Sequence, residues 1–228
     1  MPMCMMLTPR RGLYRLAVVT GVLCLMSACT DVSMGSLETV KQAVHGGTSV
    51  HPTAESVAAE PYYQLQVSAP GGEAILLLAS VQGDLLGWYG PEGQAVFLKH
   101  GVLVKTLGLT RNLDAMQLDG DPFASGLQHV QAPVTYQRVM DWSPDYHYGI
   151  HVQAQLQPMA MENVDILGTV HRLRRFDEHL RAVETGFDVV NRYWVDPADG
   201  FIWKSRQYAA PGQALELIQL RPYRGPQT

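Results

Sequence analysis

Two pairs of aspartates are close enough in the sequence to be tested as acid/base pairs acting on a sugar substrate. They are Asp141 with Asp145, and Asp196 with Asp199. A glycoside hydrolase places two carboxyl groups about 5–10 Å apart across a cleft. Both segments also contain a proline, and aspartate side chains often bond backbone N–H groups in such turns. The pattern therefore favours two structural turns, with a glycan-modifying enzyme that uses these aspartates as the alternative.

Other kinds of site find less support in the sequence. His147 and His151 are four residues apart, a spacing that chelates a metal on a helix. In a strand, four residues span about 13 Å, which is too far for one ion. Ser205 lies between Lys204 and Arg206, but neighbours in a strand point to opposite faces. We predict no catalytic residue, no metal site, no nucleotide-binding loop and no cofactor.

The segment NRYWVDPADGFIWKSRQY at 191–208 is dense in aromatic and charged side chains. Tryptophans beside cationic groups can contact a glycan or a protein partner, although large aromatic side chains more often fill a core. Strand alternation predicts that Trp203 and Ser205 lie on the face opposite Lys204 and Arg206. We name five candidate glycan or partner contacts: Trp142, Arg192, Trp203, Lys204 and Arg206.

The start of the chain predicts export. The chain has 228 residues, 46% of them hydrophobic, and a formal net charge of −4. This charge argues against a nucleic-acid partner, because such proteins usually carry a basic excess. Arg10, Arg11 and Arg15 precede a short apolar run at 16–26, and small residues follow. That is the form of a secretory signal peptide, and the run is too short for a membrane span.

Cys29 is the predicted lipidation site. The segment LMSAC at 25–29 resembles a bacterial lipoprotein signal, in which cleavage before the cysteine frees it for acylation, for example by palmitate. Cleavage there removes Cys4 and Cys24, so no cysteine pair is left for a disulfide. Thr30 stands where an inner-membrane retention signal usually carries aspartate. We therefore expect a lipid anchor in the outer membrane, with the protein facing the periplasm.

The hydrophobic pattern divides the chain into three parts. These are a signal peptide at 1–28, a lipidated tether with one short helix at 29–60, and a single antiparallel β domain at 61–228. Apolar residues at helical spacing place the tether helix near 37–44. From Tyr62 onward a period of two dominates. It is clearest at 148–157, where one face is apolar and the other polar, as in an antiparallel sheet.

Turn residues separate the remaining segments. The mixed spacing at 110–118 predicts a short helix, and 171–184 fits either a helix or a strand. The fold class is predicted to be mainly β, with antiparallel sheets in a sandwich or a partly closed barrel and one or two short helices. Further strands are expected at 83–89, 94–99, 102–106, 187–195, 201–208 and 215–220.

Three segments resemble a known family. They are FLKHGVLVKTLGLTRNL at 97–113, VMDWSPDYHYG at 139–149 and NRYWVDPADGFIWKSRQYAAPG at 191–212. Together with the lipoprotein signal, they are similar to the YjbF/GfcB lipoproteins over about 62–222. The resemblance implies an outer-membrane lipoprotein that works with exopolysaccharide or group 4 capsule assembly and export. It also implies an extended conformation through 169–184, and no catalytic residues.

These observations give three functional hypotheses. The first is a non-catalytic lipoprotein that supports polysaccharide export by binding other export proteins or the polysaccharide itself. The second is a carrier whose β-cup holds a lipid or a lipid-linked glycan, which predicts an apolar pocket of a few hundred Å³. The third is the glycan-modifying enzyme, which predicts a polar cleft with convergent carboxylates.

Overall fold

The computed structural model describes residues 50–225, which belong to one compact unit. Twelve strands make up most of this unit: β1 Gln64–Ala69, β2 Gly72–Gln82, β3 Leu85–Tyr89, β4 Ala95–Lys99, β5 Val102–Leu107, β6 Asn112–Asp119, β7 Val134–Ser143, β8 His147–Ile166, β9 Thr169–Ala182, β10 Phe187–Val195, β11 Ile202–Ala210 and β12 Gln213–Arg221.

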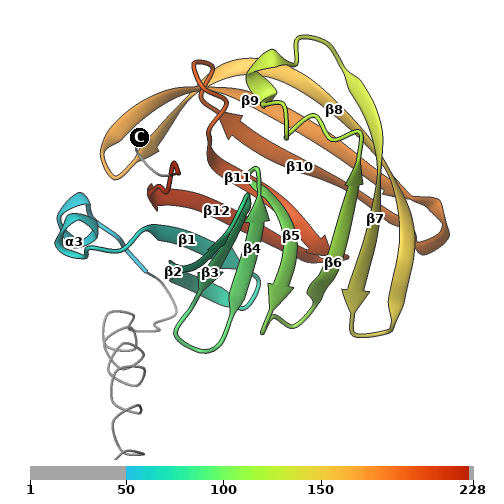
Figure 1. Ribbon diagram of the computed structural model, residues 1–228, viewed down its shortest axis with the longest axis horizontal. Helices are drawn as coiled ribbons and strands as arrows, with labels where there is room; N and C mark the ends of the chain where they lie inside the picture. Colours follow the sequence, from blue (N-terminus) through green and yellow to red (C-terminus); the bar gives the residue numbers. More distant parts are fainter. Residues whose placement is uncertain (1–49, 226–228) are drawn as a thin grey trace, which may run out of the picture. The chain divides into compact units, whose positions relative to one another are not determined.

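The strands form one antiparallel sheet with the order β5-β4-β3-β2-β1-β12-β11-β10-β9-β8-β7-β6. This sheet curls until its two end strands approach each other, which gives a nearly closed barrel (Figure 1). The mainly β prediction is confirmed, and of the two forms left open the structure is the barrel. The segment 171–184, which was ambiguous in sequence, is extended within β9 as far as Ala182.

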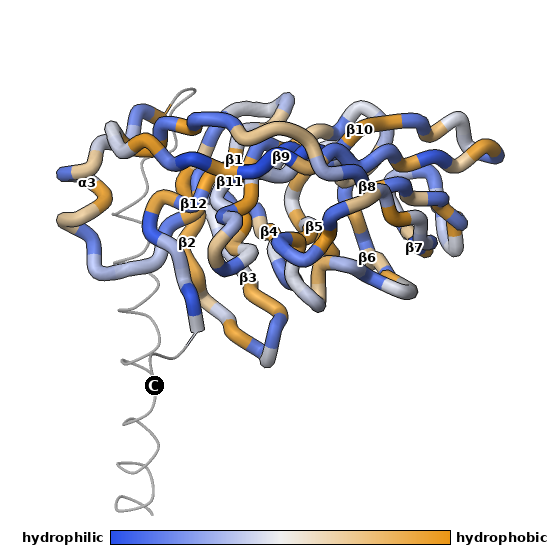
Figure 2. The backbone as a smooth tube through the Cα atoms, turned by 90° about the horizontal axis from the view of Figure 1, so that it is seen from above, coloured by the Kyte–Doolittle hydropathy of each residue, from blue (hydrophilic) through white to orange (hydrophobic). Residues whose placement is uncertain are grey.

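Strand alternation builds the barrel wall. On β8, Val152, Ala154 and Leu156 are buried, whereas Gln153 and Gln155 between them are exposed. Figure 2 shows polar and apolar residues following one another along the strands in the same way. Because side chains alternate between the two faces of a strand, the apolar set faces the barrel interior and the polar set faces outward.

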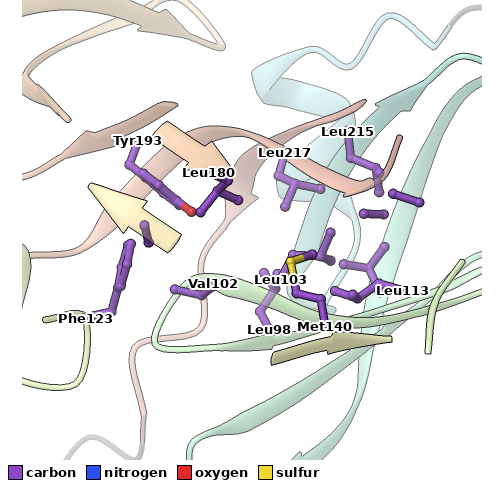
Figure 3. Packing of buried hydrophobic residues seen from close by; sticks show 14 of the residues in the cluster. Leu98, Val102, Leu103, Leu113, Phe123, Met140, Leu180, Tyr193, Leu215 and Leu217 are labelled. Carbon is purple, nitrogen blue, oxygen red and sulfur yellow. The ribbon is translucent and has the colours of Figure 1, made fainter. Parts of the chain in front are cut away.

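Side chains fill the interior of the barrel between its ends. Residues from opposite walls meet there, as Figure 3 shows for Leu103, Met140 and Leu217. The ring of Phe123, from the loop between β6 and β7, meets the Tyr193 ring edge-on with centroids 4.9 Å apart. The centre of the barrel is therefore a packed core.

The seam between β5 and β6 is closed by side chains. Thr106 Oγ1 accepts a hydrogen bond from Leu113 N (2.9 Å) and lies 3.3 Å from Asn112 Oδ1. From the opposite wall, Gln207 Oε1 accepts from Leu103 N (2.8 Å), and Gln207 Nε2 donates to Gly101 O (2.9 Å). At this free edge of β5, which has no strand ladder, Gln207 thus supplies hydrogen bonds to the backbone at Leu103 and Gly101.

The predicted helix at 110–118 is wrong, because these residues form β6. A register shift between Leu113 and Ala115 inserts one extra residue into the strand. Leu113, Met116 and Leu118 all pack in the interior, so their spacing is three and then two. A β-bulge therefore produced the mixed spacing that the sequence analysis interpreted as helical.

A short helix and a hairpin tip cover part of the outer wall. Helix α3, Ala54–Ala59, is capped by Thr53, and its Val57 packs with Ile166 and Leu220. Ile166 lies at the tip of the long β8–β9 hairpin, which reaches the region of α3 in Figure 1. The described part of the expected tether, 50–60, is thus attached to the barrel wall.

The remaining short elements are the 3-10 helices Leu127–His129 and Val183–Thr185. Between residues 50 and 225, no helix is long and apolar enough to span a membrane. The predicted signal peptide, Cys29 and the helix expected near 37–44 lie outside the described residues.

Candidate functional site

Three of the five candidate contacts lie on one outer face of β10 and β11. Arg192 and Arg206 are direct partners across these strands, and Lys204 follows one step along the same face. Lys204 Nζ lies 3.0 Å from Glu216 Oε1, and Arg192 Nε lies 4.0 Å from an Asp177 oxygen. Arg206 is exposed, so it is the most accessible cation of the three.

Trp203 does not share a face with Ser205, so this part of the prediction is wrong. The pairing of β10 with β11 shifts register beside Trp203, which is the extra residue of a bulge. The Trp203 ring packs in the outer cluster with α3 and stacks on His171 at 4.2 Å between centroids. Ser205 is buried on the inner side. The bulge therefore turns Trp203 outward, beside the face that carries Lys204 and Arg206.

Trp142 is fully buried, which corrects its assignment as a surface contact. Alternation along β7 puts it on the inner face with Met140. Its ring lies 5.4 Å from the Phe187 ring and 5.5 Å from the His147 ring, measured between centroids. A side chain without exposed surface cannot touch a glycan or partner, so Trp142 is a core residue here.

The two aspartate pairs bond at turns. Asp141 Oδ1 accepts from Gly149 N (2.6 Å), and Asp145 pairs with Arg111 at 3.5 Å. Asp196 Oδ1 accepts from Ala198 N (3.0 Å), and Asp199 Oδ1 accepts from Phe201 N (2.9 Å). The turn predicted between β10 and β11 is confirmed. Asp141, Asp196 and Asp199 therefore bond backbone N–H groups of their own hairpins, whereas Asp145 forms an exposed ion pair with a residue distant in sequence.

His147 and His151 of β8 do not belong to a cluster of metal-ligating side chains. His147 stacks on Trp142, and His151 is exposed on the outer face. No group of three or more His, Cys, Asp or Glu side chains within the described residues could hold a metal ion.

The barrel interior contains an ion pair that the sequence analysis missed. Glu178 of β9 is fully buried, and its Oε1 accepts hydrogen bonds from Arg138 Nη2 and the Tyr136 hydroxyl. Its Oε2 accepts from Asn191 Nδ2 (3.0 Å) and the Tyr193 hydroxyl (2.8 Å). Both carboxylate oxygens are therefore paired twice. We call this group the Glu178 centre.

The Glu178 centre changes the acidity of its neighbours. Burial, helped by the negative charge of Glu178, raises the pKa of Tyr136 and Tyr193 well above the usual value of 10.0. Burial alone would lower the pKa of Arg138, but Glu178 overcomes this effect and raises it. On the exposed wall, the hydrogen bond from His179 lowers the pKa of Asp188. Tyr136, Tyr193 and Arg138 thus all stay protonated at neutral pH.

Two cavities lie at the two ends of β12. One, of about 290 Å³, is lined by turns that include Gly72, Pro91 and Thr110, and by Gln213. We call it the Gln213 mouth. The other, of about 800 Å³, is lined by the turns at Asp84, His100 and Asp199, the loop around Ser125, the tail residue Arg224, and Gln219. We call it the Gln219 mouth. The packed core lies between the mouths.

The Gln219 mouth holds buried polar atoms without partners. Gln219 is only 8% exposed, and its Oε1 makes no hydrogen bond to the described residues. Gln128 Oε1, in the loop before β7, is likewise buried and unpaired. Leaving such an acceptor unsatisfied costs about 1–3 kcal/mol. A single glutamine in a strand carries no sequence signal, so sequence reasoning could not find this site.

Comparison with known proteins identifies relatives across most of the chain. Residues 37–220 match the family described as "Group 4 capsule polysaccharide lipoprotein gfcB, YjbF". The uncharacterized lipoprotein GfcB of Escherichia coli (strain K12) is 21% identical over 201 residues, which cover 86% of this chain and 94% of GfcB.

The fold also matches a solved structure. The crystal structure of the hypothetical lipoprotein YmcC from Escherichia coli (K12) superposes with a TM-score of 0.72 and 19% sequence identity, and covers 86% of this chain and 98% of YmcC. The shared barrel and the family match over residues 37–220 confirm the resemblance found in the sequence. The chain therefore belongs to the YjbF/GfcB family of group 4 capsule polysaccharide lipoproteins.

Proposed function

We propose that this protein is a non-catalytic accessory lipoprotein of exopolysaccharide or capsule export at the outer membrane. It acts by binding other export proteins and the polysaccharide, and it faces the periplasm. The observation that carries this proposal is the filled barrel. Core side chains and the Glu178 centre occupy the interior, so contact with a large partner is left to the outer wall and the two mouths.

The outer wall has the character of a binding surface. Arg192, Lys204 and Arg206 carry positive charge on one face of β10 and β11, and Trp203 lies beside them. Glu216 and Asp177 are interspersed with these cations, so the face carries both signs of charge. Interspersed charges fix the register of a complex and reject wrongly charged partners, which suits recognition of a protein.

The lipid anchor belongs to the same proposal. Acylation of Cys29 after signal cleavage would attach palmitate-type chains, and two or more chains anchor a protein stably. With Thr30 following the cysteine, the mature protein is sorted to the outer membrane. The barrel then stays within reach of export machinery at that membrane.

A deletion strain tests this function. The gene is removed from a capsule- or exopolysaccharide-producing cell, and surface polysaccharide is quantified after complementation. We expect the wild-type chain and the Asp141→Asn and Asp199→Asn variants to restore export. We expect Cys29→Ser to fail and to leave the membrane fraction. Hydrolysis of the polysaccharide by the purified protein, abolished by either aspartate variant, would overturn the proposal.

Crosslinking in the native envelope supplies the second measurement. A photocrosslinker placed at Arg206 on the outer wall should capture a polysaccharide export protein. The same crosslinker at Gln153, on the exposed face of β8, is the matched control. Recovery of export components from neither position would count against a role in export.

A further inference from the structure

A line of four charged side chains crosses the outer wall from β9 to β12. Asp177 is the direct strand partner of Arg192, and Arg192 is the direct partner of Arg206. Arg206 is in turn the direct partner of Glu216, so all four side chains lie on the same face. Neighbouring strands are about 4.8 Å apart, which makes the line about 14 Å long. We call these four residues the charged row, and its charges run negative, positive, positive, negative.

Cations outside the charged row hold its two acids more closely than the arginines inside it do. Arg175 Nε lies 2.9 Å from an Asp177 oxygen, whereas Arg192 Nε lies 4.0 Å from the other Asp177 oxygen. At the opposite end of the row, Lys204 Nζ lies 3.0 Å from Glu216 Oε1. The two central arginines are therefore left with one long ion-pair contact between them.

Arg192 and Arg206 are two like charges that lie directly opposite each other. Such a pair destabilises an antiparallel sheet. Arg206 is exposed, lies over the Tyr208 ring at 5.9 Å, and forms no ion pair with the described residues. Carboxylates placed against the two guanidinium groups would remove this repulsion, because the planar fork of an arginine matches a carboxylate with two parallel hydrogen bonds. The centre of the row therefore fits a pair of carboxylates.

The acids at the two ends of the charged row select the kind of anion. A uniformly anionic polymer, such as a chain of uronic acids, brings further carboxylates against Asp177 and Glu216, and like charges facing each other reject a partner. A protein surface can instead present two carboxylates with a cation on either side, which complements all four members of the row. The chain as a whole has a net charge of −4, so an acidic group is guided to this row rather than to the average surface.

An aromatic side chain adjoins the charged row. Trp194 and Ile218 lie on either side of Lys204, one step along the same outer face, and both are partly exposed. The indole Nε1 of Trp194 donates to Glu162 Oε2 (2.6 Å), and Lys204 Nζ lies 5.3 Å from the centre of the indole ring. Tryptophan and arginine supply much of the binding energy at protein interfaces. The row therefore lies beside a tryptophan whose orientation is fixed before a partner binds.

We propose that the charged row docks an export protein that presents two adjacent aspartate or glutamate side chains flanked by lysine or arginine. The two carboxylates bind Arg192 and Arg206, and the flanking cations face Asp177 and Glu216. This inference deepens the proposed function and rests on it, because it takes the partner from the export machinery. It specifies the charge pattern that the partner must carry.

Carbodiimide crosslinking of the full chain in native envelopes tests this charge pattern. The reagent joins a lysine amine to a carboxylate in direct contact with it and leaves no spacer. Arg206→Lys keeps the charge of the row and supplies the amine, and mass spectrometry identifies the residue or sugar joined to position 206. Arg172→Lys is the matched control, because Arg172 is an exposed arginine of β9 near the tip of the β8–β9 hairpin.

We expect position 206 to be joined to an aspartate or glutamate of an export protein that has a second carboxylate beside it. Arg206→Glu should lower the amount of that protein that co-purifies with the chain about tenfold, whereas Arg206→Lys and Arg172→Glu should retain it. Replacing the identified partner carboxylate by arginine should restore binding to Arg206→Glu. Crosslinks to the polysaccharide alone, no intermolecular crosslink at position 206, or equal recovery of the partner with Arg206→Glu and Arg172→Glu would overturn the docking surface.

The two proposals fail separately. Loss of export in the deletion strain, with equal partner recovery from Arg206→Glu and Arg172→Glu, would remove the charged row as a docking surface and keep the export role. Normal export in the deletion strain would remove the export role, and the identity of the partner with it.

Discussion

Two buried polar centres in this barrel differ in how their acceptor oxygens are hydrogen-bonded, although Arg138 Nε in the first of them also has no partner among the described residues. At the Glu178 centre, both carboxylate oxygens accept two hydrogen bonds each, from β7 and β10 side chains. At the Gln219 mouth, two amide oxygens are buried with no partner in the described chain. The first arrangement ties β9 to β10 and, past β8, to β7, whereas the second leaves two acceptors buried beside a cavity without a hydrogen bond. The comparison separates a polar group that holds strands together from polar groups that burial leaves unsatisfied.

Breaking the Glu178 centre should have the largest effect. Glu178→Leu leaves Arg138 charged and buried without its partner, so we expect a loss of about 3–5 kcal/mol in the free energy of unfolding. Guanidinium denaturation measures this loss. The double variant Arg138→Met/Glu178→Leu removes both charges and should recover most of the stability. Equal losses in the single and double variants would show that the ion pair itself is not the cause.

Alkaline pH should weaken the same centre. A tyrosine whose pKa is raised in the folded chain contributes stability that is complete below its ordinary pKa of 10.0 and is lost as the pH rises above that value. Each of Tyr136 and Tyr193 should therefore lower the free energy of unfolding by about 1.4 kcal/mol per pH unit in that range. Denaturation of wild type and Tyr193→Phe between about pH 9 and 11 measures both slopes. An identical slope in Tyr193→Phe would contradict the assignment.

Gly200→Ala sharpens the comparison at the mouth. Gly200 has φ 79°, and a Cβ there would collide with the Gln128 side chain. We expect a loss of about 1–2 kcal/mol from the left-handed backbone, and displacement of the Gln128 amide. Gly212→Ala is the control, since its φ is 74° and open space surrounds it. Thermal unfolding compares the two variants, and Gly200→Ala should lose more stability than Gly212→Ala because only its Cβ meets a side chain.

The smallest effect is expected on the outer wall. Lys204 and Glu216 lie 3.0 Å apart with partly exposed side chains. Lys204→Ala should therefore change the free energy of unfolding by about 0.2–1 kcal/mol, with the effect shrinking as salt is added. A larger, salt-independent loss in urea denaturation would mean that this face packs more tightly than an ordinary exposed surface.

Much of the barrel could be predicted from local patterns. The alternation along 148–157, the turn at Asp196–Gly200 and the extended 169–182 segment all appear as expected. The errors occur at two bulges. One extra residue in β6 disguised a strand as a helix, and one in β11 moved Trp203 to the other face. A bulge changes the period locally, and its position depends on partner strands that are distant in sequence.

The sites were less accessible to sequence reasoning. Trp142 lies between the polar residues Asp141 and Ser143 yet is fully buried, whereas Trp203 follows the apolar Phe201 and Ile202 yet lies in the outer cluster. Glu178 and Arg138 are forty residues apart, so their pairing depends on the way β7 and β9 curl toward each other. The burial of Gln219 and its lack of a hydrogen-bond partner follow from its place near the end of β12. Each of these facts depends on tertiary position, which hydrophobic periodicity does not encode.

The central place of β1 in the sheet has a mechanical consequence. β1 pairs with β12 on one side and with β2 on the other, so both of its edges carry hydrogen-bond ladders. A force directed along β1 would therefore act on both ladders at once, and many hydrogen bonds would share it. A pull from the predicted membrane anchor would meet a strand that is held on both of its edges.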